Sequence, residues 1–147
     1  MHLRSVCIME HQVFLRQLEA NALPASDFNH RAHLYAAWGY RREYPAPEAA
    51  ARCAHALSRF AMANGAATKY NHTLTMALLA IAYSRVESCP ALMEDWPAFL
   101  DRCSDLASDA RAVLEQYYSA ERLQTDSARK AFVKPDREPL PVSCLLN

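Results

Sequence analysis

Apolar residues recur at intervals of three and four along most of this sequence, a spacing that predicts amphipathic α-helices. Proline and glycine separate the segments, because proline cannot continue a helix and glycine favours its C-terminal end. The predicted helices cover 9–22, 26–44, 45–64, 71–86, 104 or 108 to 118, and 120–132, with a short turn around 96–103. The pattern predicts an all-α fold: a single domain over residues 1–132, built as an orthogonal or up-and-down bundle of five to six helices.

The apolar residues are distributed differently in two of these segments. In 45–64, Cys53, Leu57 and Phe60 face one way and charged residues face the other, which is typical of a helix at the surface of a core. Segment 71–86 is apolar nearly all round, so we expect it at the buried centre of the bundle. Residues 133–147 contain three prolines and are expected to form an extended tail along the surface.

Composition agrees with one small helical domain. The chain has 147 residues, 52% of them apolar, and only two glycines, so it can bury a core without disulfides or metal. Sixteen basic and sixteen acidic residues give a formal net charge of zero, which argues against a nucleic-acid partner. Glycines at only two positions, Gly39 and Gly65, disfavour a glycine-rich phosphate loop.

Several features predict a cytoplasmic protein. Residues 1–10 contain no apolar run after a basic start, so no secretory signal is expected. The longest uncharged stretch, 70–84, includes Asn71, His72 and two threonines and is too short and polar to span a bilayer. The five cysteines are scattered and odd in number, which predicts reduced thiols and no disulfide framework. No membrane partner is expected, and a homodimer is compatible with the sequence.

The candidate chemistry begins with two histidines. His30 and His33 lie three residues apart, so on a helix they share a face, which continues through Tyr40 and Tyr44. Paired imidazoles at this spacing can chelate Zn, Fe, Cu or Ni when another segment supplies further ligands. The alternative to a metal site is that both histidines are partly buried and hydrogen-bonded within the protein. A further alternative is that one of them reaches solvent.

A third histidine and a glutamate extend this candidate site. His72 begins the segment predicted to be most buried, and an imidazole from a second helix would suit a metal site with open coordination positions. Glu19, beside the apolar face of the first helix, is a candidate carboxylate ligand. The alternatives are local packing or hydrogen bonding for His72 and exposure to water for Glu19.

Short motifs add a resemblance. The chain contains the motif Phe28-Asn29-His30-x-x-His33-Leu34, followed by Gly65, by Tyr70-x-x-Thr73-Leu74-Thr75 and by a closing stretch from Tyr118 to Leu140. Together these segments resemble small bacterial helical proteins of unassigned function. The likeness spans residues 14–140. In that group the tyrosine is followed by His and Glu, whereas this chain has Asn71 and His72. The resemblance implies a polar pocket built on the three histidines and carries no activity with it.

Two functions follow from these observations. The first is a metal-dependent enzyme of bacterial metabolism or biosynthesis that acts on a small organic substrate. His30, His33, His72 and Glu19 would bind a divalent metal, and Tyr70 or Tyr40 would donate or relay a proton. The second is a non-catalytic helical module that binds an apolar ligand or a partner helix in an aromatic-rich groove.

Overall fold

Helices account for the regular structure of residues 10–141, the part of the chain that the computed structural model describes. They are α2 (His11–Glu19), α3 (His30–Glu43), α4 (Ala46–Ala63), α5 (His72–Ser88), α6 (Trp96–Arg102), α7 (Ser104–Ser108), α8 (Ala110–Leu114), α9 (Ala120–Leu123) and α10 (Asp126–Lys130), with 3₁₀ turns η1 (Ala25–Asp27), η2 (Ala67–Lys69) and η3 (Pro90–Glu94). This part of the chain contains no strand, and the predicted all-α fold is confirmed.

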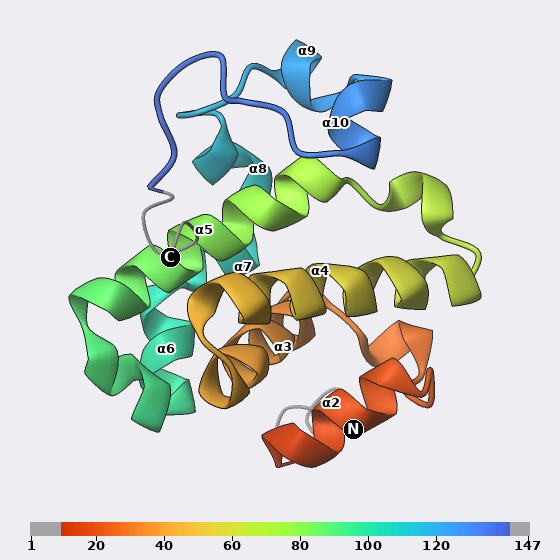
Figure 1. Ribbon diagram of the computed structural model, residues 1–147, viewed down its shortest axis with the longest axis vertical. Coiled ribbons are helices and arrows are strands. Elements are labelled where there is room, and N and C mark those ends of the chain that lie inside the picture. The colour runs from red at the N-terminus through yellow and green to blue at the C-terminus, as the bar shows by residue number, and fades with distance from the viewer. Residues whose placement is uncertain (1–9, 142–147) are drawn as a thin grey trace.

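The two longest helices define the architecture. α4 and α5 run in opposite directions, pack against each other, and diverge toward the end where η2 connects them (Figure 1). α3 packs against α4, and α2 packs against both, while α6 and α7 contact α3. α8 and α10 cover α5. None of the helices in residues 10–141 is long and apolar enough to cross a bilayer.

The start of α3 differs from the prediction. Ser26 lies in η1, and the helix begins at His30 after an N-cap at Asn29. The Asn29 side chain accepts a hydrogen bond from the backbone N–H of Ala32 at 3.0 Å, and asparagine is as good an N-cap as serine. His30 and His33 therefore belong to the first turn of α3, at the end of the helix and not along its middle.

The later predicted helices are divided by additional N-caps. Segment 104–118 forms α7 and α8, because Asp109 accepts from the backbone N–H of Ala112 at 3.1 Å and starts a new helix. Segment 120–132 forms α9 and α10, where Thr125 takes the same role. The expected turn around 96–103 is largely helix α6, and the Asp95 side chain caps it.

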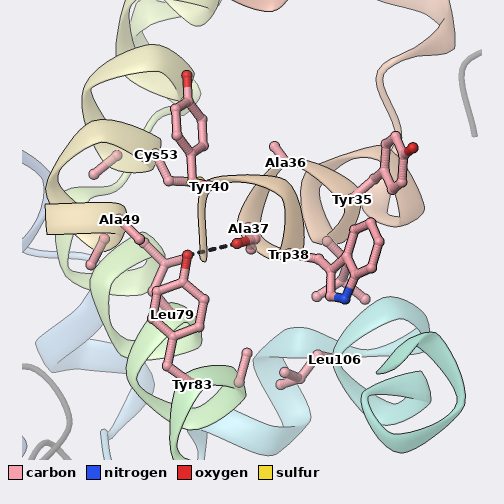
Figure 2. Close-up of a cluster of buried hydrophobic side chains, with 14 of the residues drawn as sticks. Tyr35, Ala36, Ala37, Trp38, Tyr40, Ala49, Cys53, Leu79, Tyr83 and Leu106 are labelled. Atoms are coloured by element: carbon pink, nitrogen blue, oxygen red, sulfur yellow. Dashed lines mark hydrogen bonds between the residues drawn. The ribbon is translucent and has the colours of Figure 1, made fainter. Parts of the chain in front are cut away.

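α5 lies in the core, as its all-round apolar pattern predicts. Figure 2 shows Tyr83 of α5 directing its hydroxyl toward α3, where it donates a hydrogen bond to the Ala37 carbonyl at 2.7 Å. Small buried side chains such as Ala49 and Cys53 of α4 stand nearby. Alanine and cysteine at these positions allow the three helices to approach closely at native packing density.

The segment after α10 packs along the first turn of α5. Thr73 is fully buried, and its hydroxyl donates to the Ala131 carbonyl at 2.8 Å and accepts from the Val133 N–H at 3.0 Å. The described part of the expected tail, 133–141, has no regular structure, while Leu140 within it is buried. Residues 142–147 of the predicted tail lie outside the described residues.

Candidate functional site

A cleft of about 700 Å³ is lined by the second half of α4 and by α5, together with the start of α3. We call it the interhelical cleft. Its walls are mostly apolar and come from α3, α4 and α5, with Leu57, Phe60, Leu74 and Leu78 among the lining residues. Its polar lining side chains are His30, His33, Asn64, Lys69, Tyr70, Asn71, Thr75, Ser108, Asp109 and Arg111. A concave, largely apolar site of this size with a few polar groups is typical of small-molecule binding sites.

His33 has a defined tautomer in this cleft. Its Nδ1 lies 2.7 Å from the backbone carbonyl oxygen of Asn29. A carbonyl oxygen can only accept a hydrogen bond, so Nδ1 carries the proton and donates it. In the neutral ring, Nε2 then holds an unprotonated lone pair that can accept a hydrogen bond, take a proton or bind a metal.

The surroundings of His33 favour this neutral form. Desolvation by the surrounding protein lowers the pKa of His33; the hydrogen bond to Asn29 opposes this shift, and the nearby His30 adds to it. The ring packs against Phe28 with 4.4 Å between centroids, while the residue remains open to solvent on a wall of the cleft. His33 is therefore predominantly neutral at pH 7.

His30 stands beside His33 as the first residue of α3. The centroids of the two imidazole rings are 6.1 Å apart, and His30 is exposed. Both side chains line the cleft, so the structure brings this predicted pair together. Their juxtaposition follows from the spacing of three residues within the first turn.

Tyr70 lines the same cleft, and His72 does not take part in its lining. The Tyr70 hydroxyl lies 3.0 Å from Nδ1 of His72 and 3.3 Å from the Ala54 carbonyl oxygen. Burial raises the pKa of Tyr70 to about 12 and lowers the pKa of His72. Tyr70 is therefore a protonated phenol at neutral pH, and His72 is its half-buried neighbour.

Glu19 and Tyr40 meet each other away from the interhelical cleft. The Tyr40 hydroxyl donates to Oε2 of Glu19 at 2.6 Å. Burial and the hydrogen bond to Glu19 raise the pKa of Tyr40. Glu19 lines a smaller hollow of about 240 Å³ together with Arg52, His55 and Arg59. These two predicted residues thus form a contact between α2 and α3.

The predicted metal ligands are distributed over three places. His30 and His33 line the cleft, His72 contacts Tyr70, and Glu19 contacts Tyr40. Across residues 10–141, no three His, Cys, Asp or Glu side chains are grouped so that they could hold a metal ion together. Metal binding at this site stays a prediction.

The later helices contribute residues to the cleft that the sequence pattern does not predict. Asp109 and Arg111, at the start of α8, line it together with Lys69 of η2. Asp109 carries a local signal as an N-cap residue, but nothing in its neighbourhood along the chain indicates that it lines the same cleft as His30 and His33.

Comparison of this chain with protein-family models, with curated proteins and with solved structures finds no match. The geometry of the interhelical cleft is therefore the basis on which a function can be proposed.

Proposed function

We propose that this protein binds a small, mostly apolar organic molecule in the interhelical cleft. The observation that carries the proposal is the combination of about 700 Å³ of space with apolar walls and imidazoles on one side. Burial of an apolar ligand against leucine and phenylalanine side chains supplies the main favourable free energy. The polar groups of the cleft would orient the molecule and select among ligands of similar shape.

Binding of N-phenyl-1-naphthylamine tests the proposal. This neutral fluorophore emits more strongly when it leaves water, so titration of the full chain yields a dissociation constant. Ala61 lines the cleft, whereas Ala63, two residues further along α4, is exposed and is not part of the lining. We expect Ala61→Trp to weaken binding at least tenfold and Ala63→Trp to leave it within twofold of the wild-type value.

Circular dichroism and urea unfolding of both variants serve as controls for folding. The proposal is contradicted if the fluorophore does not bind, or if the two tryptophan variants bind it equally well. A third variant, Leu78→Phe, narrows the cleft from the α5 side and provides an independent measurement.

Metal-dependent catalysis is a second candidate function, favoured by one observation. His30 and His33 share the cleft, and the neutral Nε2 of His33 is the form of imidazole that metals bind. Tyr70 lines the same cleft and carries its proton at neutral pH, so it would be the proton donor. Elemental analysis of untagged protein tests this candidate. A stoichiometric metal that is lost in His33→Ala supports it, and the absence of metal contradicts it.

A further inference from the structure

The side chains that line the interhelical cleft differ in whether their hydrogen-bonding atoms are already engaged. Asn71 accepts from the backbone N–H of Leu74 at 2.9 Å and donates to the Leu123 carbonyl at 2.8 Å. Asp109 caps α8, and the Tyr70 hydroxyl contacts His72. These groups have partners within the protein, so a ligand would have to compete with them.

His33 differs from these groups because one of its two ring nitrogens is still open. Nδ1 donates to Asn29, which leaves Nε2 as a lone pair, and no second hydrogen bond of this ring is found within residues 10–141. In the free protein, water reaches this exposed side chain. A ligand that displaces the water must present a hydrogen-bond donor to Nε2, since an acceptor placed there would leave two lone pairs facing each other.

Aromatic rings stand next to this acceptor. Phe28 lies between His33 and Phe60, with ring centroids 4.4 Å from the first and 4.8 Å from the second. All three side chains line the cleft. Aromatic side chains favour stacked or edge-on contact with other rings, so this end of the cleft suits a planar ring in the ligand.

Together these contacts point to the chemistry of the ligand. We propose that the cleft selects neutral aromatic molecules that carry an O–H donor, of the phenol type, with Nε2 of His33 as the acceptor. This inference rests on the proposed function, because it specifies the ligand class for the same cleft. The competing class is an aromatic anion attracted by Lys69 and Arg111 at the cleft, which would meet the carboxylate of Asp109 there as well.

Three naphthalenes of closely similar shape separate these classes. 2-Naphthol offers an O–H donor, 2-methoxynaphthalene has the same oxygen without the hydrogen, and 2-naphthoate is an anion. Their dissociation constants for the full chain are measured by fluorescence titration and calorimetry at pH 7.5. We expect 2-naphthol to bind at least tenfold more tightly than either of the other two molecules.

Two variants test whether His33 is the acceptor responsible for the preference for 2-naphthol. His33→Leu removes the acceptor and keeps a bulky side chain, so we expect 2-naphthol and 2-methoxynaphthalene to bind it within twofold of each other. The matched control is His55→Leu, an exposed histidine of α4 outside the cleft lining, which should keep the tenfold preference. If the preference survives in His33→Leu, another group is the acceptor and the proposal is overturned.

The protonation of the two ring nitrogens of His33 can be measured directly on the wild-type protein. Long-range ¹H–¹⁵N NMR distinguishes a protonated from an unprotonated ring nitrogen. We expect Nδ1 of His33 to be protonated, Nε2 to be unprotonated, and the Nε2 resonance to shift when 2-naphthol is added. A proton on Nε2 overturns the proposal.

The outcomes separate this inference from the proposed function. Equal binding of 2-naphthol and 2-methoxynaphthalene, or preference for 2-naphthoate, overturns the inference and leaves a ligand-binding cleft. Failure of all three molecules and of N-phenyl-1-naphthylamine to bind overturns both.

Discussion

The hydroxyl of Tyr40 donates a 2.6 Å hydrogen bond to Oε2 of Glu19 and so joins α3 to the last residue of α2. The ring of Tyr40 is buried, whereas Glu19 lies at the surface. A hydrogen bond to a carboxylate is stronger than one between neutral groups. This contact therefore helps to hold the N-terminal helix against the rest of the bundle.

Tyr40→Phe is expected to lower the free energy of unfolding by about 1 kcal/mol, because it removes this hydrogen bond and keeps the buried ring. Urea unfolding of the wild-type protein, Tyr40→Phe, Glu19→Ala and the double variant measures the coupling between the two residues. Strictly additive effects of the two substitutions would contradict a direct interaction.

Tyr83→Phe removes the hydrogen bond from α5 to the Ala37 carbonyl of α3 (Figure 2). Tyr83 is almost fully buried, so we expect the free energy of unfolding to decrease by about 1 kcal/mol. Tyr44→Phe, at a half-buried position after α3, is the control and should change stability less. Equal effects at the two positions would show that the hydrogen bond contributes nothing measurable.

Asn71 joins the start of α5 to α9 through its two hydrogen bonds. Asn71→Asp keeps an oxygen that can cap the helix but removes the donor to the Leu123 carbonyl. Asn71→Ala removes both interactions. We expect Asn71→Ala to cost about 2 kcal/mol, the sum of a cap and a buried hydrogen bond.

Thermal or urea unfolding compares these variants with Asp95→Ala, which removes only the cap of α6 and should cost about 1 kcal/mol. If Asn71→Ala is no more destabilising than Asp95→Ala, the bond to Leu123 does not matter for stability.

Stability should depend on pH through His33 and His72. Desolvation by the surrounding protein lowers the pKa of His33 and of His72 in the folded state, so in weakly acidic solution the unfolded chain binds more protons at these residues. The free energy of unfolding is therefore expected to fall as the pH decreases through about 6.5, the ordinary pKa of histidine. It should level off once the pH is below the folded-state pKa values.

Urea unfolding between pH 8 and pH 5.5 measures this dependence. His33→Gln and His72→Gln should each flatten it, and His55→Gln, in α4 and outside the lining of the interhelical cleft, is the matched control for the substitution. An unchanged slope in both the His33 and the His72 variants would show that these histidines titrate alike in the folded and unfolded chains.

Local sequence alone determined most of the helical structure. The predicted segment 45–64 corresponds to α4 and the segment 71–86 to α5, because proline, N-cap residues and apolar periodicity act over a few neighbouring residues. The pairing of His30 with His33 was predictable for the same reason, as both lie in one helical turn. The burial of α5 followed from its apolar pattern.

The beginning of α3 was not decided locally. Ser26 and Asn29 are both good N-cap residues, and the structure uses Asn29. With the helix starting there, Phe28 lies before the first turn and packs against Phe60 of α4 and Phe14 of α2. Those contacts join the segment before α3 to residues of α2 and α4 that are distant in sequence, so the choice depends on tertiary packing.

The interhelical cleft and the placement of the polar residues were decided only by the tertiary structure. The lining of the cleft extends from Ala25 to Arg111 and so joins residues that lie far apart in the sequence. His72 contacts Tyr70, and Glu19 contacts Tyr40, so neither joins the histidine pair of α3. Periodicity indicates which side of a helix is buried, but not which residues of other helices it meets, because helix crossing angles depend on the packing of the whole core.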